Sequence, residues 1–368
     1  MHNRTNIRVI IAGGGTGGHI FPAVAIANAL MKRNAQNQIL FVGALGKMEM
    51  EKVPKEGYKI IGLPIAGFNR SNMLKNITLP FKLIKSLWLA KKVVKDFNPD
   101  AVVGVGGYAS FPILKVAQNL DIPTLIQEQN SYAGKSNMQL GKKANSICVA
   151  YKGMDKFFAK DIITLTGNPV RAVIANAAVN KNEALEVFGL QANKKTILII
   201  GGSLGAKSIN DTIIEQHNAL LAEGVQILWQ TGKTSFESAK QSVIGKENKI
   251  KVLDFIQQMD KAYAAADIVI SRAGALSIAE LCIVAKPVVF VPYPHAAEDH
   301  QTVNAMALVN NNAASIVADA DVKTKLVPAL VALMEDENTC NTYSKQLKQM
   351  AIADADERIV NQLYNILK

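Results

Sequence analysis

Three glycine clusters, each directly after a short apolar run, most constrain the fold of this chain. They lie at residues 7–19, 101–110 and 196–208, which read IRVIIAGGGTGGH, AVVGVGGYAS and TILIIGGSLGAKS. An apolar strand that ends in glycines and leads into a helix exposes backbone N–H groups at the positive end of the helix dipole. Such a turn can hold a phosphate without a metal ion. Three of them predict two anionic ligands that meet between two lobes.

Apolar runs typical of strands alternate with helical patterns along most of the 368 residues. This alternation predicts an α/β protein with two doubly wound parallel sheets, each covered by helices on both faces. Ligands of such sheets bind at the carboxyl ends of the strands. The Gly-Asn-Pro breaker after residue 166 places the boundary between domains 1–166 and 167–349. The expected strands are Arg8–Ala12, Ile39–Gly43, Lys59–Leu63, Ala101–Val105, Thr124–Gln127, Ser146–Ala150, Thr196–Ile200, Gln226–Trp229, Lys249–Leu253, Ile268–Ser271 and Val288–Val291.

The composition narrows the class of partner. Lys and Arg number 41 against 30 Asp and Glu, a formal net charge of +11, which favours nucleic acid, anionic lipid or a phosphorylated substrate without choosing among them. Cys148, Cys282 and Cys340 are far apart and form no CxxC pair, so we expect a reduced compartment. No segment has the pattern of a signal peptide or a membrane-spanning helix.

The first glycine loop leaves a second enzyme class open. Gly13, Gly15 and Gly18 fit the G-x-G-x-x-G pattern of nicotinamide and flavin enzymes. That pattern needs an acidic residue after the second strand to hold the ribose, and Glu49 and Glu51 come late for this role. An NAD(P)-dependent oxidoreductase therefore remains the alternative enzyme, and a basic nucleic-acid binder the alternative without catalysis.

The third glycine loop and three histidines are further candidate groups. The third loop resembles a P-loop with Ala206 in place of its last glycine, so we expect a shorter anion site to which Ser203 adds a hydroxyl. His19 lies where a helix N-terminus disfavours the protonated ring, so it can accept a proton or merely cap the turn. The spacing of His295 and His300 does not place both rings on one helix face, and no metal site is predicted.

These motifs closely resemble those of the MurG family of peptidoglycan glycosyltransferases, nearly from end to end. The family is matched by GGGTGGH with Pro22, VGVGGYAS, QEQN at 127–130, TGNPVR at 166–171, GGSLGA at 201–206, DFI at 254–256, SRAGALSIAE at 271–280, VPYPH at 291–295, DHQ at 299–301 and NA at 304–305.

The resemblance implies a GT-B fold, in which two Rossmann-like domains face a deep cleft. It implies UDP-N-acetylglucosamine (UDP-GlcNAc) as donor, held mainly by the second domain, and an undecaprenyl-diphospho-N-acetylmuramoyl-pentapeptide (lipid I) as acceptor on the first. The last helix, about 350–368, would pack back on the first domain. The transfer inverts the anomeric centre and forms a β-1,4 bond; no cofactor and no nucleic acid are implied, whereas proteins of cell-wall synthesis or division are further candidate partners.

The family's site residues carry over position by position. His19 is the first choice for the catalytic base and Glu128 the second, while Glu280 would hold the ribose and Ile256 the uracil. The acceptor diphosphate would lie on Gly14, Gly15, Gly104, Gly106, Gly107 and Tyr108. The implied donor contacts are Thr16, Gly17, Gly18, Asn130, Arg171, Ser203, Ile256, Ala275, Leu276, Ser277, Ile278, Ala279, Glu280 and Gln301.

Residues 74–94 carry two apolar stripes at helical spacing. Leu83, Leu87, Ala90 and Val94 form the stripe expected to pack on the sheet. A second stripe among lysines suits an anionic bilayer, at about 1 kcal/mol per lysine near the surface, although a helix buried on both sides fits the pattern equally well. The lipid-borne acceptor of the family favours peripheral binding to the cytoplasmic face of the bacterial plasma membrane. The expected contacts are Leu74, Ile77, Phe81, Ile84, Trp88, Lys85 and Lys92.

Overall fold

The computed structural model describes residues 6–67, 77–175, 178–202 and 204–368. The chain divides into two compact units, each with its own core. Unit 1 comprises Met1–Arg171 together with Asp354–Lys368, and unit 2 comprises Ala172–Ala353. From the sequence, the end of the first domain was expected at residue 166 and the start of the returning helix at about residue 350. Each unit is described by itself below.

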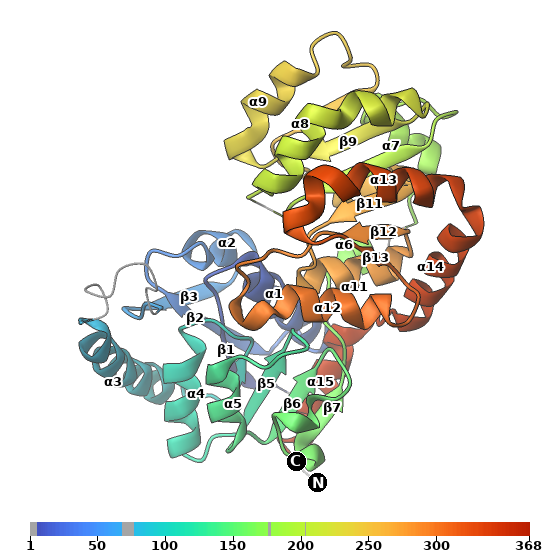
Figure 1. The fold of residues 1–368 in the computed structure, drawn as a ribbon. Helices are drawn as coiled ribbons and strands as arrows, with labels where there is room; N and C mark the ends of the chain where they lie inside the picture. The colour runs from blue at the N-terminus through green and yellow to red at the C-terminus, as the bar shows by residue number, and fades with distance from the viewer. Residues whose placement is uncertain (1–5, 68–76, 176–177, 203) are drawn as a thin grey trace. The chain divides into compact units, whose positions relative to one another are not determined.

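Unit 1 is built on a parallel sheet that, within the described residues, has seven strands in the order β3-β2-β1-β4-β5-β6-β7 (Figure 1). The chain reverses direction across the sheet between β1 and β4, where Val9 pairs with Ile39 on one side and Ala101 on the other. This is the switch point at which such sheets bind ligands. The strands are β1 (Arg8–Ala12), β2 (Gln38–Ala44), β3 (Lys59–Leu63), β4 (Ala101–Gly104), β5 (Thr124–Glu128), β6 (Ser146–Val149) and β7 (Ile163–Leu165).

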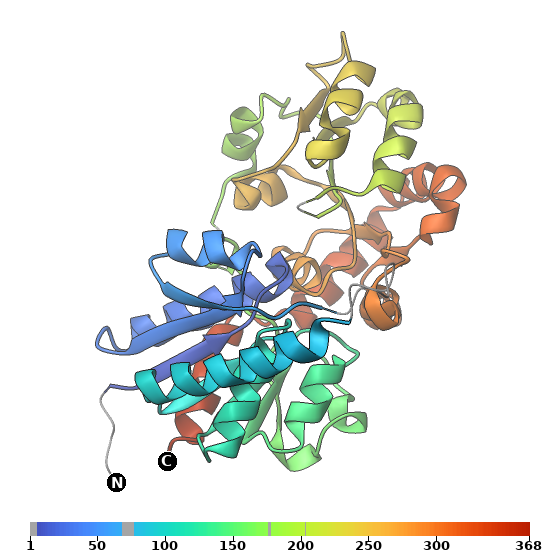
Figure 2. The same ribbon diagram turned by 90° about the vertical axis from the view of Figure 1, so that its left-hand side faces the viewer.

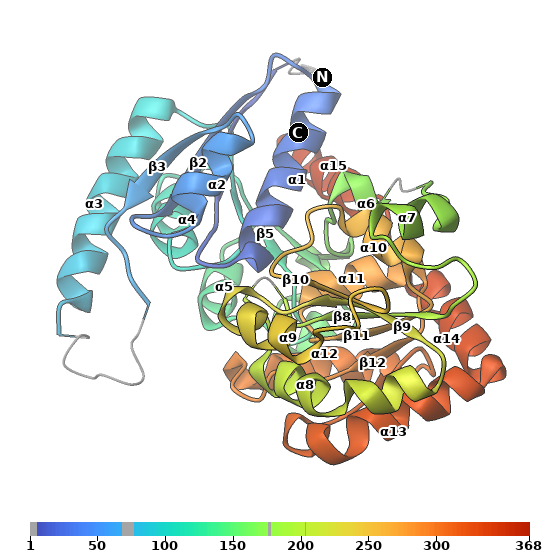
Figure 3. The ribbon, with the colours of Figure 1, turned by 90° about the horizontal axis from the view of Figure 1, so that it is seen from above.

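Helices cover both faces of this sheet. Helices α3 (Leu79–Phe97), α4 (Ser110–Asn119) and α5 (Lys135–Gly141) pack on one face. Helices α1 (Gly17–Arg33), α2 (Glu49–Lys55) and α15 (Ala355–Asn365) pack on the other. Figure 2 shows α3 and α4 in cyan in front of the strands and the red α15 behind them, and Figure 3 shows α15 beside α1. The last helix therefore belongs to unit 1.

Unit 2 repeats the same plan. In the described part of the chain its parallel sheet has six strands in the order β10-β9-β8-β11-β12-β13, so its switch point lies between β8 and β11. The strands are β8 (Thr196–Ile200), β9 (Gln226–Gln230), β10 (Ile250–Leu253), β11 (Ile268–Ser271), β12 (Val288–Phe290) and β13 (Ser315–Ile316). The helices are α6 (Ala172–Ala175), α7 (Lys181–Val187), α8 (Lys207–Ala222), α9 (Phe236–Ser242), α10 (Met259–Ala265), α11 (Ala275–Val284), α12 (His300–Val309), α13 (Val322–Glu335) and α14 (Glu337–Met350).

The strands expected from the sequence all form, and each end lies within one residue of its expected place. Their central residues are almost fully buried because helices cover both sides of each sheet. The strands β7 and β13 were not expected, since they are short edge strands whose residues are only partly buried. Helices α6, α7 and α13 were not expected either, nor was helix α2. Its sequence EMEKVPK is charged and contains Pro54, and its burial rests on Glu49 and Val53.

Candidate functional site

At the switch point of unit 1, the first two glycine loops pack against each other. Gly107 lies so close to the first loop that an added Cβ would stand 2.3 Å from the carbonyl oxygen of Gly14. The buried hydroxyl of Ser110 lies 2.8 Å from the carbonyl oxygens of both Ala12 and Gly106, to which it donates. The loops after β1 and β4 thus form one structure, although almost a hundred residues separate them.

His19 lies in the first turn of α1 and points into this structure. Its Nδ1 atom lies 3.0 Å from the carbonyl oxygen of Gly14, which can only accept, and 3.4 Å from the hydroxyl of Thr16. The Nδ1 atom therefore carries the proton in the neutral ring, which leaves the basic lone pair on Nε2. A Cβ added to Gly106 would stand 2.8 Å from Nε2, so a glycine is needed there to leave room for the imidazole.

Glu49 holds the first glycine loop, and was not assigned to the site from the sequence. Its carboxylate is 1% exposed, and accepts from the amide of Gly15 at 2.8 Å and from the amide of Ala44 at 2.9 Å. Because these bonds engage both oxygens in the interior, the residue does not serve as the ribose-binding acid of a dinucleotide site. The amide of Gly15 donates to Glu49 instead of facing a ligand, which weakens the expected contact between Gly15 and a diphosphate.

Glu128, the second choice for the base, is also buried. Its oxygens accept from the amides of Asn130 and Gly134, at 3.1 Å and 3.0 Å, and from the side chain of Asn137 at 2.8 Å. Burial raises the pKa of this carboxyl in spite of the hydrogen bonds that it accepts from Gly134, Asn137 and Asn130. The side chain thus holds the turn after β5 in place.

Buried amide side chains connect that turn to the second glycine loop. Gln129 donates to the carbonyl of Val105 at 2.6 Å, and Gln127 donates to the Oδ1 atom of Asn168 at 2.9 Å. Asn168 in turn donates to the carbonyl of Gln129 at 2.9 Å. The start of the GNPVR segment is therefore fixed to the carboxyl ends of β4 and β5, which positions the residues that follow it.

Arg171 and Tyr108 lie at the edge of the same region of unit 1. The guanidinium of Arg171 stands 5.9 Å from the ring centre of Phe21, in the first turns of α1. Tyr108 is half exposed and packs on Gly67, where an added Cβ would lie against the ring. Neither contact could be expected from the sequence, because both join segments far apart in the chain.

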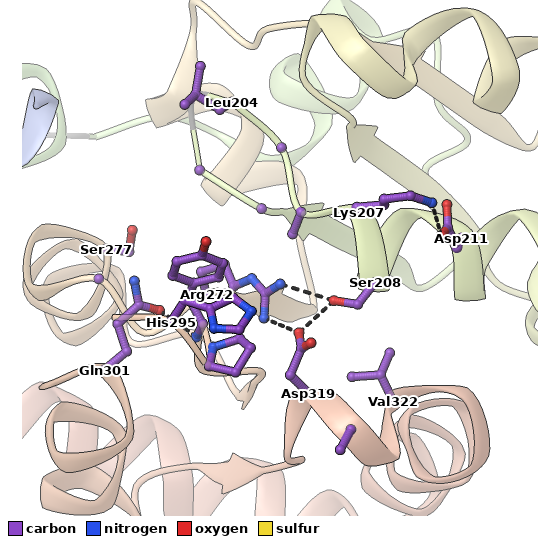
Figure 4. A pocket seen from close by; sticks show the side chains of 18 of the residues that line it. Leu204, Lys207, Ser208, Asp211, Arg272, Ser277, His295, Gln301, Asp319 and Val322 are labelled. Carbon is purple, nitrogen blue, oxygen red and sulfur yellow. Dashed lines mark hydrogen bonds and ion pairs between the residues drawn. The ribbon is translucent and has the colours of Figure 1, made fainter. Parts of the chain in front are cut away.

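The switch point of unit 2 contains a cavity of about 990 Å³. It opens between the loop after β8 and the start of α11, and its size suits a nucleotide sugar. Of the expected donor residues, Ser277 and Gln301 line it, while Ser203 lies outside the described residues. Figure 4 shows Arg272, Ser208 and Asp319 joined at its centre, a cluster that was not expected to act in the site.

Arg272 brings a positive charge to this cavity. Its guanidinium donates to the carbonyls of Val291 and Pro292, each at 3.0 Å, and to the hydroxyl of Ser208 at 3.0 Å. It also forms an ion pair with Asp319. These bonds fix a guanidinium that is 8% exposed at the carboxyl end of β11, where it can face an anion.

The residues expected to hold uridine have partners of their own. The amide of Ile256 donates to Gln230 at 2.8 Å, and Gln230 donates to the carbonyl of Gly202 at 2.9 Å. A uracil ring can therefore pair with the Ile256 amide only by displacing Gln230. The buried carboxylate of Glu280 accepts from the hydroxyl of Tyr263 at 3.1 Å, which orients it.

The segment Ala275–Glu280 forms the first turns of α11 after the extended residue Gly274. Ile278 points into the core of unit 2, so its side chain is not a ligand contact. The turn between β11 and α11 also follows a strand at the switch point of unit 2. It is a fourth such loop, in addition to the three glycine clusters noted in the sequence. Within the part of the chain that the structure describes, no cluster of His, Cys, Asp and Glu side chains is arranged to hold a metal ion.

Comparison with known families decides between the enzyme classes. Residues 9–149 match the glycosyltransferase family 28 N-terminal domain, and residues 196–359 match the C-terminal domain of the same family. The chain belongs to glycosyltransferase family 28. The family's two domains thus start at the first strand of unit 1 and the first strand of unit 2. The comparison gives no support to the oxidoreductase alternative.

Individual members of family 28 are similar over the whole chain. A UDP-N-acetylglucosamine–N-acetylmuramyl-(pentapeptide) pyrophosphoryl-undecaprenol N-acetylglucosamine transferase from Phocaeicola vulgatus is 53% identical, covering 98% of this chain and 96% of the relative. The enzyme of that name from Parabacteroides distasonis is 51% identical, covering 98% of both chains. The crystal structure of Acinetobacter baumannii MurG matches with a TM-score of 0.78 and 31% identity, covering 98% and 99% of the two chains. The fold is therefore GT-B.

Helix α3 of this family 28 protein carries an exposed apolar stripe. Phe81, Ile84 and Trp88 are each about two-thirds exposed or more, while Ala90 and Val94 are buried against the sheet. The alternative of a helix buried on both sides is wrong. Pro80 lies in the first turn, so Ile77 belongs to the turn before the helix and not to a helical stripe. Leu74 lies outside the described residues.

Within the described ranges, no helix is both long and apolar enough to cross a bilayer.

Proposed function

We propose that this protein transfers N-acetylglucosamine from UDP-GlcNAc to the 4-hydroxyl of the N-acetylmuramoyl group of lipid I, which gives lipid II. The observation that carries the proposal is the identity of 53% over nearly all of the chain to a transferase named for this reaction. The glycine loops at both switch points, with a histidine at one and an arginine at the other, supply the chemistry that the reaction needs.

Unit 2 is the proposed donor domain. Arg272 and the amides of the loop after β8 offer positive charge to the diphosphate of UDP-GlcNAc. Glu280, oriented by Tyr263, is suited to accept hydrogen bonds from the ribose hydroxyls. As UDP leaves with the electron pair of the broken sugar–phosphate bond, negative charge grows on its phosphate. Fixed donors stabilise that charge without having to reorganise.

Unit 1 is the proposed acceptor domain, and His19 is the proposed base. Its Nε2 lone pair takes the proton from the acceptor hydroxyl as that oxygen attacks the anomeric carbon from the side opposite UDP. A single displacement of this kind inverts the anomeric centre, as a β-linked product from an α-linked donor requires. The loop around Gly106, Gly107 and Tyr108 is proposed to hold the acceptor diphosphate.

The exposed stripe of α3 is proposed to bind the cytoplasmic face of the bacterial plasma membrane. Phe81, Ile84 and Trp88 provide the apolar surface, and the exposed Lys85 and Lys92 provide charge for anionic headgroups. The expected test is sedimentation with phosphatidylglycerol vesicles, from which the Trp88→Ser variant should be largely lost. Equal binding of this variant and the wild type would overturn the membrane role.

The transfer itself is tested with labelled UDP-GlcNAc and a short-chain lipid I analogue. The wild-type protein should form a disaccharide product at a rate that depends on both substrates. UDP-GlcNAc should also raise the melting temperature, whereas NADH should leave it unchanged. A protein that is stabilised by NADH and forms no disaccharide would contradict the proposal.

A further inference from the structure

The peptide bond between Gly14 and Gly15 connects two ionisable side chains. Its N–H donates to the Oε2 atom of Glu49 at 2.8 Å, and its C=O accepts from Nδ1 of His19 at 3.0 Å. The N–H and C=O of a trans peptide point in opposite directions, so a single planar group bridges the carboxylate and the imidazole. Hydrogen bonds that share one polar group in a chain strengthen one another.

We propose that Glu49 is a positioning residue that orients and polarises His19 through the Gly14–Gly15 peptide. This inference rests on the proposed role of His19 as the base. The carboxylate draws the peptide dipole toward itself, which makes the Gly14 oxygen a stronger acceptor. That oxygen then keeps the proton on Nδ1 and stabilises the imidazolium formed when Nε2 takes a second proton.

The surroundings of Glu49 are shaped for its carboxylate. A Cβ added to Gly14 would lie 2.2 Å from its carboxyl carbon, and one added to Gly43 would lie 2.6 Å from its Cγ atom. Glycines at the ends of two neighbouring strands thus let the carboxylate approach the peptide. The amide of Ala44 donates to Oε1 and the amide of Gly15 donates to Oε2, so the two bonds engage different oxygens of the carboxylate.

Other ionisable groups among the described residues of unit 1 also lie around these loops. The turn after β5 contributes the carboxyl of Glu128, the second glycine loop contributes the phenol of Tyr108, and the end of the unit contributes Arg171 over the ring of Phe21. None of these groups is altered in Glu49→Gln. A difference in the pKa of His19 between the wild type and a Glu49 variant therefore reports the carboxylate.

The direct test is an NMR titration of the full-length protein with labelled histidine. The chain has five histidines, and His19→Ala identifies the signal of His19. In the wild type the neutral ring should carry its proton on Nδ1. In Glu49→Gln the pKa of His19 should fall by about one unit, because a nearby carboxylate favours the protonated ring. The matched control is Glu51→Gln, which removes an exposed charge from the same helix and should leave the pKa unchanged.

Transfer kinetics give a second readout. In Glu49→Gln, kcat should fall by about 10- to 100-fold, as for other partners that orient a functional histidine, while KM for UDP-GlcNAc changes little. The acidic limb of the pH profile should move to lower pH together with the pKa of His19. A purely structural role for Glu49 would reduce the amount of folded enzyme but would not move the pH profile.

Three results would overturn the inference: an unchanged His19 pKa in folded Glu49→Gln, an equal shift in Glu51→Gln, or a wild-type ring protonated on Nε2. The protonation site of the wild-type ring is measured without a variant, so this test can be made even if Glu49→Gln does not fold. Full turnover by His19→Ala would instead refute the proposed base. The titration would still decide whether Glu49 and His19 are coupled.

Discussion

The first glycine loop of unit 1 and the corresponding loop of unit 2 have the same backbone plan but differ in the side chains that contact them. Both follow the central strand of a parallel sheet and lead into a helix at the switch point. In unit 1 a carboxylate from the next connection, Glu49, accepts from the loop. In unit 2 the neighbouring groups are the amide of Gln230 and the guanidinium of Arg272, which is paired with the carboxylate of Asp319.

This difference indicates that the glycine pattern alone does not determine what a loop binds. The backbone supplies N–H donors in both units. In unit 1 the buried carboxylate of Glu49 accepts from the loop itself, whereas in unit 2 the carboxylate of Asp319 accepts from Arg272 and from Ser208 in the helix that follows the loop. The side chain that arrives from the neighbouring strand or helix decides between the two outcomes.

The largest expected effect is that of His19→Ala. Loss of a general base should lower kcat by about 10²- to 10⁴-fold, while the Kd for UDP, measured by calorimetry, should stay within about twofold because the cavity lies in unit 2. The control is His300→Ala, in a histidine that is not assigned to catalysis. If His19→Ala weakens UDP binding as much as it lowers kcat, the proposed division of labour between the two loops is wrong.

Arg272→Ala should show the reverse behaviour. The change removes a nearly buried cation and leaves Asp319 without its ion-pair partner, so we expect about 3–5 kcal/mol less stability. In the protein that remains folded, UDP binding measured by calorimetry should be lost. The double variant Arg272→Met with Asp319→Leu removes both charges and should recover stability but not binding. Recovery of UDP binding in this variant would show that the guanidinium does not contact the diphosphate.

A matched pair of glycine variants sharpens the comparison of the loops. Gly106 and Gly202 have similar left-handed φ angles of 96° and 87°, so alanine should cost about 1–2 kcal/mol of backbone strain at either position. Around Gly202 there is open space, whereas a Cβ on Gly106 meets the ring of His19. Gly106→Ala should therefore be the more destabilising in thermal unfolding and should also lower kcat. Equal losses of stability would show that the ring moves aside without cost.

The smallest expected effect concerns the cysteines of the two cores. Burial raises the pKa of both Cys148, in unit 1, and Cys282, in unit 2, to about 12. Because the thiolate is the reactive form, a pKa raised that far keeps both thiols unreactive at pH 8. Neither should react with a disulfide reagent until the protein unfolds. Rapid labelling of only one of them would identify the unit that opens more easily.

The sequence allowed the frame of both units to be predicted, but not the groups that surround the glycine loops. Continuous apolar runs identify strands buried on both faces, so the order of strands and helices followed from local pattern. The contact between Glu49 and Gly15 spans 34 residues and that between Arg272 and Asp319 spans 47. The local sequence does not distinguish Glu49 from the exposed Glu51 two residues later. Only the pairing of strands in the sheet brings Glu49 next to the first glycine loop.

Hydrogen–deuterium exchange with and without UDP tests the division of labour between the two loops most directly. The account predicts that UDP slows exchange most in the loop after β8 and at the start of α11, at residues 204–208 and 275–280. Exchange at residues 13–19 should change less, because the amide of Gly15 already donates to Glu49. Strong protection at residues 13–19, with none at 204–208, would contradict the account.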